Sequence, residues 1–443
     1  MFYSSVFTGF EMESEDFRKL EDNVFDALFG KLGGPIEKNE IPGYIEEVAK
    51  SINPALSKED ISRIIKDAKE FAPIDEYLAD EQVEDIMINN TRNIFIYHSR
   101  VGDEKVAERI SNKHDLETFV KKLKMYTTTT TANKNILDVH LPNGSRANII
   151  ESPLGADVTI RNFKKTAMSI IDLINLGELS YNMAGRLWLY AEGLKVRPAN
   201  LLIGGMPASG KTTMLNSMFS FFRPEQRVIV IEETYELNTE TQENCVRLET
   251  SLDVGIEDLV KNALRIRPDI LIIGEIRGEE AKDMMTAMNI GKISMGTIHA
   301  STTRDVVTRL EHAPMNIEKD IIPLIDAMIM ISHVQENGKN LRKVTQISEI
   351  SGIETQVLLS DLYSYDYKTH KGSDILPSIT YRDLLAKLTG TPPIEIIAEE
   401  QRRGRILEQL NKQGLRDLQS INEYCKEYYD NPDRAIRKIG LKN

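Results

Sequence analysis

A glycine-rich turn between an apolar run and a helical pattern constrains this chain more than any other feature. Residues 200–218 read NLLIGGMPASGKTTMLNSM, with an apolar run at 201–203 and apolar residues at helical spacing after the turn. The turn satisfies G-x-x-x-x-G-K-[ST], in which backbone N–H groups surround a phosphate at the start of a helix. The residues predicted to bind this phosphate group are Gly205, Met206, Pro207, Ala208, Ser209, Gly210, Lys211, Thr212 and Thr213.

Two side chains of this turn indicate the chemistry of the ligand. Lys211 is expected to reach the β- and γ-phosphates of a nucleotide, and Thr212 to ligate Mg²⁺. An accidental match is disfavoured because a strand-like run precedes the turn and a helical stripe follows it. The sequence therefore predicts a nucleotide site that also uses Mg²⁺.

The composition is that of a globular protein with two or three domains. The chain has 443 residues, of which 41% are hydrophobic and 28% are charged. A net charge of -13 argues against a general nucleic-acid surface, although it leaves room for local basic patches. The two cysteines, Cys245 and Cys425, form no C-x-x-C pair, so neither a disulfide framework nor a structural zinc site is indicated. A reducing, cytoplasmic setting fits this usage.

The sequence predicts neither a membrane span nor a secretory signal. No apolar run approaches the ~20 residues that a spanning helix needs. The strongest candidate, residues 321–331, is too short and contains Asp326. The N-terminal MFYSSVFTGF lacks a positive region and runs into acidic residues. Its aromatic residues favour a frayed or core-packed segment over a docking site for a partner.

The hydrophobic pattern changes several times along the chain. Charge-mixed helical patterns come first, and short alternating runs with a hairpin turn at 142–144 follow. Continuous apolar strands at 228–231, 270–273 and 294–297 then alternate with helical stretches, which is typical of a parallel sheet covered on both faces. The predicted segments are a helical region (1–73), an α+β sheet domain (74–163), a linker and entry helix (164–186), an α/β core (187–340) and a hairpin-like and helical extension (341–443).

A glutamate follows one of the core strands. The run ILII ends in Gly274 and Glu275, which places a carboxylate at the carboxyl edge of the sheet, where α/β folds bind ligands. Gly274 occupies the place of the usual strand-end aspartate. We therefore expect Mg²⁺ to be held by Thr212, phosphates and waters, with Glu275 acting through water. Taken alone, this glutamate is equally typical of a solvated strand end.

Two further strands end in groups that could act on a phosphate. The strand VIVI ends in an acidic cluster that includes Glu232 and Glu236. Such crowded carboxylates are costly unless they face a cation or water, although a solvated acidic loop is an equal alternative. His299 follows the third strand, where it could sense the γ-phosphate or hold the catalytic carboxylate. A lone histidine is more often structural.

The order of these motifs resembles a known family. GxxxxGKT, IEETYEL, LRIRPDILIIGEIRG and GTIHAST are similar to the Walker A, Asp box, Walker B and His box of the secretion ATPase superfamily. That superfamily drives type II and type IV secretion, type IV pili and the archaellum. The resemblance spans roughly residues 74–365, and it implies a RecA-like P-loop ATPase domain that uses ATP and Mg²⁺. It also implies hexamers, with nucleotide between the N- and C-terminal domains and at subunit borders.

The resemblance implies a role for several residues of this chain. Glu275 corresponds to the catalytic glutamate, Glu232 and Glu236 to the Asp-box carboxylates, and His299 to the His-box residue. Three arginines correspond to residues that contact phosphates: Arg265 and Arg277 match the LR and GEIR arginines, of which one or both act at a neighbouring subunit's nucleotide, and Arg161 matches an N-terminal-domain arginine.

The chain also departs from many bacterial members of the family. It lacks their four clustered zinc-binding cysteines. Together with the PMN stretch at 314–316 and the following IIPLIDAMIM, this makes it most similar to archaeal and tight-adherence members.

The function expected from this resemblance is a homo-hexameric ATPase motor. It would push on a polytopic membrane platform protein to assemble or secrete pilin-like subunits, and would lie in the cytoplasm at the inner face of the membrane through that partner. A nucleic-acid translocase or helicase is disfavoured by the acidic charge. An ATP-binding switch or scaffold with little hydrolysis is disfavoured by the presence of both Lys211 and Glu275. The sequence does not distinguish pilus, archaellum and secretion system, nor extension from retraction.

Overall fold

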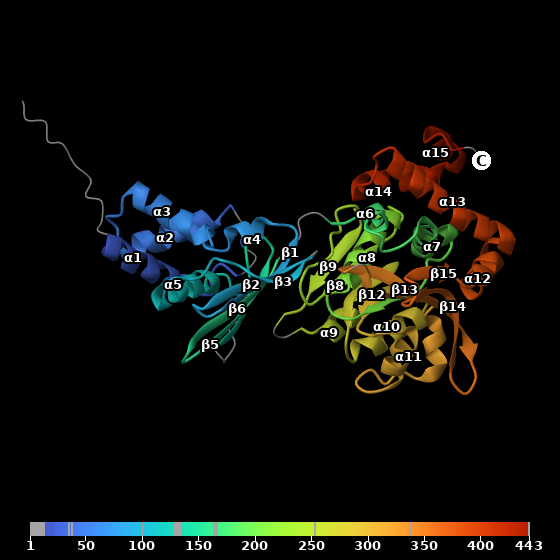
Figure 1. Ribbon diagram of the computed structural model, residues 1–443, viewed down its shortest axis with the longest axis horizontal. Helices are drawn as coiled ribbons and strands as arrows, with labels where there is room; N and C mark the ends of the chain where they lie inside the picture. Colours follow the sequence, from blue (N-terminus) through green and yellow to red (C-terminus); the bar gives the residue numbers. More distant parts are fainter. Residues whose placement is uncertain are drawn as a thin grey trace, which may run out of the picture. The chain divides into compact units, whose positions relative to one another are not determined.

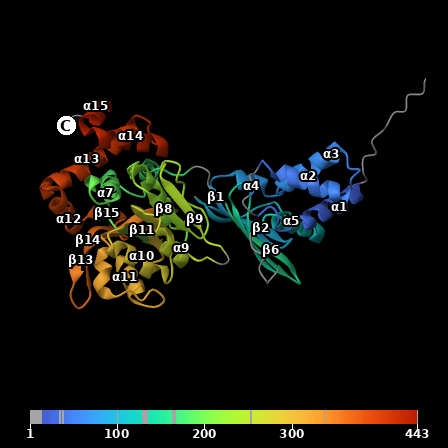
Figure 2. The same cartoon turned by 180° about the vertical axis from the view of Figure 1, so that it is seen from behind.

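The chain forms two compact units, Met1–Lys165 and Thr166–Asn443, shown in Figure 1 and from behind in Figure 2. The computed structural model describes residues 14–33, 36, 39–99, 101–127, 135–162, 167–251, 254–336 and 338–441. The aromatic N-terminal stretch and positions 164–166 of the expected linker lie outside the described residues. The sequence predicts five segments, which divide the chain further than the two units do, and this division stays a prediction.

The first unit begins with amphipathic helices. One of them starts at a capping box, in which the side chains of Ser57 and Asp60 each accept a hydrogen bond from the other residue's backbone N–H. The helices of the unit are α1 (Ser14–Ala27), α2 (Ile41–Ile52), α3 (Lys58–Lys69), α4 (Asp75–Ala79) and α5 (Lys113–Lys124).

A six-stranded sheet, in the order β3-β2-β1-β6-β5-β4, completes the first unit. All of its neighbouring strands are antiparallel. Alternate residues of β6 are buried, so one face packs against a core that includes Phe17 and Val24 of α1 and Leu116 of α5. The predicted hairpin joins β4 and β5, with Gly144 at a φ of +96°. The strands are β1 (Val83–Asn89), β2 (Asn93–His98), β3 (Gly102–Lys105), β4 (Ile136–His140), β5 (Arg146–Ser152) and β6 (Gly155–Arg161).

A nine-stranded sheet, in the order β15-β14-β13-β12-β7-β11-β10-β8-β9, forms the centre of the second unit. The strands from β12 to β9 in this order are parallel, and β13, β14 and β15 extend the sheet beyond β12, each antiparallel to the strand before it. The strands are β7 (Leu201–Gly205), β8 (Val228–Glu232), β9 (Cys245–Glu249), β10 (Ile270–Ile276), β11 (Ile293–Ile298), β12 (Ala327–Glu336), β13 (Lys339–Ile353), β14 (Val357–Asp366) and β15 (Lys371–Asp374).

Helices cover both faces of this sheet, as the continuous apolar strands predict. In β7, Leu201 and Ile203 belong to one core and Leu202 to the other, because successive side chains of a strand point to opposite faces. The first face carries α6 (Ile170–Asn175), α7 (Tyr181–Glu192) and α8 (Lys211–Ser217). The second carries α9 (Ile256–Ala263), α10 (Glu280–Asn289) and α11 (Thr303–Glu311). The predicted α/β class, with a helical region, an α+β sheet and a RecA-like P-loop core, is confirmed.

The C-terminal helices pack on the same face as α7. They are α12 (Thr380–Thr389), α13 (Pro393–Lys412), α14 (Leu418–Asp430) and α15 (Pro432–Lys438). The buried carboxylate of Glu349 in β13 accepts hydrogen bonds from the N–H groups of Ile379 (3.0 Å) and Thr380 (2.8 Å), where α12 starts. Because β13 begins at Lys339, the boundary expected at residue 340 falls inside a strand of the core sheet. Across the described residues, no helix combines the length and the apolar character that crossing a membrane requires.

Candidate active site

The predicted phosphate-binding turn links the carboxyl end of β7 to the start of α8. Ala208 and Gly210 adopt left-handed conformations, with φ values of 59° and 96°. A Cβ atom on Gly205 would lie 2.3 Å from Ser209 Oγ, so only glycine fits at that position. Lys211 then begins the helix. The turn therefore has the strand, glycine and helix geometry that the sequence predicts.

The Lys211 side chain lies back over this turn. Its Nζ donates to the carbonyl oxygen of Met206 (3.1 Å) and lies 3.3 Å from His299 Nδ1. Burial lowers the pKa of Lys211, although the carboxylates of Glu275 and Glu236 act in the opposite direction. These two carboxylates thus share the electrostatic environment of the lysine. Thr212 and Thr213 follow in the first turn of α8 and are half-buried.

Glu275 lies near the carboxyl end of β10 and contacts Arg277 and His299. Arg277 Nη2 lies 2.5 Å from one carboxylate oxygen, and His299 Nε2 contacts the other. Arg277 also pairs with Glu233 at 3.0 Å. Burial raises the pKa of Glu275, but the hydrogen bond from Arg277 and the positive charges of Arg277 and Lys211 outweigh it, so the net shift is downward. Glu275 is therefore ionised at neutral pH.

His299 connects Glu275 to Lys211. Burial and the Lys211 charge lower the pKa of His299, despite the neighbouring carboxylate, so the ring is neutral at pH 7. A neutral ring with its hydrogen on Nε2 can accept a hydrogen bond from Lys211 at Nδ1, and Nε2 contacts Glu275 Oε1. Nδ1 also lies 3.3 Å from the Gly205 carbonyl oxygen, and the tautomer of the ring decides whether Nδ1 donates to that oxygen or accepts from Lys211.

The two predicted Asp-box carboxylates differ in their surroundings. Glu232 is buried, and its Oε1 accepts hydrogen bonds from the N–H groups of Glu236 (2.8 Å) and Leu237 (2.9 Å). Its Oε2 lies 3.4 Å from Arg247 Nη2. Burial raises the pKa of Glu232 in spite of these contacts. Glu232 thus orders the loop after β8, and Glu236 on that loop is the carboxylate whose charge reaches Lys211.

Side chains that the sequence interpretation missed hold these groups in place. Glu280 accepts hydrogen bonds from the N–H groups of Arg277 and Gly278, which fixes the turn after Glu275. Thr297 Oγ1 donates to the carbonyl oxygen of Gly274 at 2.6 Å, which ties β11 to the end of β10. The capping-box pattern does not predict the Glu280 contact, because Glu280 is the first residue of α10 and not the third. The Thr297 contact depends on strand order, which the sequence pattern does not contain.

Two predicted arginines lie elsewhere in the described structure. Arg265 is exposed and lies between α9 and the amino end of β10, whereas Glu275 is near the carboxyl end of that strand. The structure therefore does not bring these two side chains together within one chain. Arg161 belongs to the first unit, where its exposed side chain lies 3.3 Å from Asp85 Oδ1. The action of both arginines on phosphates stays a prediction.

The residues around the turn fit a metal that is bound together with a nucleotide. No cluster of three or more His, Cys, Asp or Glu side chains that could hold a metal occurs among the described residues. The available donors are the Thr212 hydroxyl at the start of α8 and the Glu275 carboxylate. Ser209 Oγ is buried without a hydrogen-bond partner in the described part of the chain, as expected for a turn shaped to accept ligand oxygens. This donor set suits Mg²⁺ that takes most of its ligands from phosphates and water.

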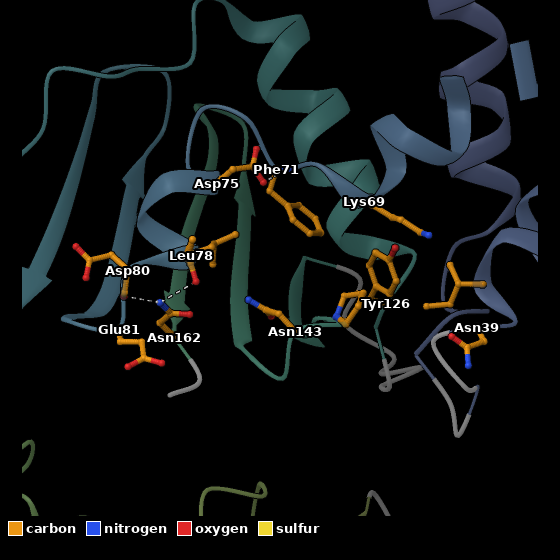
Figure 3. Close-up of a pocket in the computed structure, with 13 residues that line it drawn as sticks. Asn39, Lys69, Phe71, Asp75, Leu78, Asp80, Glu81, Tyr126, Asn143 and Asn162 are labelled. Atoms are coloured by element: carbon orange, nitrogen blue, oxygen red, sulfur yellow. Dashed lines mark hydrogen bonds between the residues drawn. The ribbon is translucent and has the colours of Figure 1, made fainter. Parts of the chain in front are cut away.

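A separate cavity of about 690 Å³ lies within the first unit (Figure 3). Phe71 and Tyr126 contribute aromatic surface, and Asp75, Asp80 and Glu81 add carboxylates. In Figure 3 the Asn162 side chain donates to backbone carbonyl oxygens beside the cavity. None of the residues predicted to act on a nucleotide lines this cavity.

Comparison with known proteins assigns the chain to a family. Residues 67–359, more than half of the sequence, match the family described as type II/IV secretion system protein. The chain belongs to this family, which confirms the resemblance drawn from the four motifs.

The relatives and the solved structure described next are each 30% identical to this chain or less. An uncharacterised protein of Methanocaldococcus jannaschii is 30% identical over 79% of this chain, and this chain spans 66% of its length. The type IV secretion system protein VirB11 of Bartonella henselae is 27% identical over 62% of this chain and 90% of its own length. Among solved structures, the pilus retraction motor PilT with bound ADP covers 80% of this chain and 96% of its own, with 16% identity and a TM-score of 0.49.

Proposed function

We propose that this protein hydrolyses ATP and works as a homo-hexameric motor. The observation that carries this proposal is the convergence of Lys211, Glu275, His299 and Arg277 beside the turn between β7 and α8. One chain thereby assembles a phosphate-binding turn, a cation for the phosphates and an ionised carboxylate. These are the parts that phosphoryl transfer to water requires.

Each of these groups has a task in the proposed reaction. Lys211 leaves its contact with Met206 and neutralises the β- and γ-phosphates. Glu275 orients the attacking water, and its low pKa keeps the carboxylate ionised for this role at neutral pH. His299 contacts Glu275 through Nε2 and Lys211 through Nδ1, so it links the water-orienting group to the phosphate-binding group. Bound Mg²⁺, held by Thr212 and through water by Glu275, would neutralise phosphate charge.

The work done by this motor is assembly or secretion of pilin-like subunits. The family assignment and the similarity to VirB11, a type IV secretion system protein, support this class of function. We propose that the motor acts from the cytoplasm on a polytopic membrane platform protein, to which it binds peripherally. A translocase that pulls on nucleic acid is less well supported, because the chain carries a net charge of -13.

Two substitutions test the proposed hydrolysis. Lys211→Ala should abolish phosphate release and weaken ATP binding, because it removes the charge that contacts the phosphates. Glu275→Gln should retain ATP binding and lower phosphate release by about 10² or more. Glu279→Gln is the matched control, because Glu279 is exposed in the same turn. Release at the wild-type rate by Glu275→Gln would remove Glu275 from the mechanism.

The same assay separates a motor from a nucleotide-binding switch. A switch or scaffold would bind ATP but release little phosphate in the wild-type protein, and Glu275→Gln would then change nothing. The ionised Glu275 beside Lys211 favours hydrolysis.

A further inference from the structure

The strand β12 runs beyond the end of its neighbour β7 and brings a histidine to the phosphate-binding turn. β12 is parallel to β7, and their last paired residues are Ile331 and Gly205. Two residues further along β12, His333 Nε2 lies 3.1 Å from the carbonyl oxygen of Ala208. His333 lies outside the four motifs from which the sequence site is built, and the strand order is what brings it to the turn.

The polarity of this contact is fixed by its partner. A carbonyl oxygen only accepts hydrogen bonds, so His333 Nε2 carries the hydrogen and donates it. Nδ1 of the same ring is buried and has no hydrogen-bond partner among the described residues. The His333 ring therefore makes one hydrogen bond among the described residues, and its partner belongs to the phosphate-binding turn.

The acceptor belongs to a residue of the turn with a left-handed backbone conformation. Ala208 has a φ of 59°, a conformation that L-residues other than Asn and Asp seldom adopt. Its carbonyl shares a peptide group with the N–H of Ser209, which donates to Met206 at 3.2 Å. Anchoring the Ala208 carbonyl on β12 thus fixes the orientation of one peptide group in the turn before any ligand arrives.

We propose that His333 is a positioning residue for the nucleotide, which holds the turn in its binding conformation through the Ala208 carbonyl. This inference rests on the proposed nucleotide binding. A preformed turn contributes equally to the bound substrate and to the transition state, so its loss raises Kd and KM more than it lowers kcat.

The test compares three substitutions in the full-length protein. His333→Phe keeps a ring without a donor and should weaken ADP and ATP binding roughly 2- to 12-fold, as expected for one lost hydrogen bond. His333→Gln retains a donor and should restore most of the affinity. Gln335→Phe, at an exposed position two residues along the same strand, is the matched control and should bind as the wild type does. KM should rise more than kcat falls in His333→Phe.

A second measurement does not depend on nucleotide. Amide hydrogen exchange of residues 206–210 should be faster in His333→Phe than in the wild type or in Gln335→Phe. If His333→Phe does not fold, as judged by thermal unfolding, His333→Ala removes the donor without adding bulk. Unchanged exchange and affinity in the folded variants, or failure of His333→Gln to restore affinity, would overturn the positioning role. Absence of nucleotide binding by the wild-type protein would instead overturn the proposed function, while the exchange comparison would still test the contact.

Discussion

His299 is the residue on which the electrostatics of the site depend, because it lies between a cation and an anion. Its Nδ1 lies 3.3 Å from Lys211 Nζ and its Nε2 contacts Glu275, and only a neutral ring can accept a hydrogen bond from Lys211 at Nδ1. Protonation would place a second positive charge beside Lys211. Protonation of His299 would therefore disrupt the contact between this ring and Lys211.

The first residue-scale prediction concerns this protonation. Burial and then the Lys211 charge lower the pKa of His299 below its usual 6.5. Lys211→Met removes the charge and should raise the His299 pKa. An NMR pH titration of labelled histidines, with His299→Gln used for assignment, measures the change. An unaltered or lower pKa in Lys211→Met would contradict the arrangement described for the site.

The second prediction gives the corresponding effect on stability. The folded-state pKa of His299 is depressed, so the unfolded chain binds a proton more readily than the folded chain. The stability that the wild-type protein has relative to His299→Gln should therefore be fully present above about pH 6.5 and decrease as the pH falls below it. Chemical unfolding of both proteins at several pH values tests this expectation. A difference that grew at low pH would show that His299 is protonated more easily in the folded chain.

At the scale of elements, Glu349 joins the sheet to the C-terminal helices. Besides the N–H groups at the start of α12, its carboxylate accepts hydrogen bonds from Tyr190 (3.1 Å) and Ser378 (2.6 Å). Glu349→Gln would bring an amide N–H₂ group against these donors. Because a buried unsatisfied donor costs about 1–3 kcal/mol, we expect a loss of that order in the free energy of unfolding. Chemical unfolding should show it for Glu349→Gln, whereas the exposed Glu354→Gln should behave as the wild type.

The sequence predicted those elements whose evidence is local. The strand before Gly205 and the helix from Lys211 followed from an apolar run, a glycine-rich turn and helical spacing. The carboxyl-edge position of Glu275 followed from the same kind of reasoning. The antiparallel strands β13 to β15 could be recognised as hairpins, but their union with β12 depends on pairing between distant residues. For the same reason the Glu232 contacts and the His333 contact were not predictable from spacing alone.

At the scale of the whole molecule, we predict that ATP hydrolysis requires the ring of assembled subunits and not the single chain alone. Arginine fingers supplied by a neighbouring subunit are worth about 10³ to 10⁵ in rate. Arg277 pairs within its own chain with Glu275 and Glu233, while Arg265 is exposed away from that cluster. If either arginine acts across a subunit border, the ATPase activity per milligram of protein should rise with protein concentration. Concentration-independent turnover by a stable monomer would contradict the ring.

Mixing two variants that we expect to be inactive alone tests the contact across the subunit border directly. Arg277→Ala and Lys211→Ala each lack what the other supplies, so mixed rings should recover part of the activity above the sum of the separate proteins. Phosphate release from mixtures at several ratios measures this recovery. If Arg277→Ala is fully active alone, Arg265 becomes the remaining candidate.

The edge strand β15 limits how copies of this chain can join. It has only four residues, Lys371 to Asp374, all exposed, and it carries a charge at each end. Short, charged edge strands are poor templates for pairing with another chain. On this side of the nine-stranded sheet, further copies are therefore discouraged from adding strands, which protects a concentrated protein from sheet-extending aggregation. Any contact between subunits on that side has to be made through side chains, and such contacts can slide or separate without breaking a ladder of backbone hydrogen bonds.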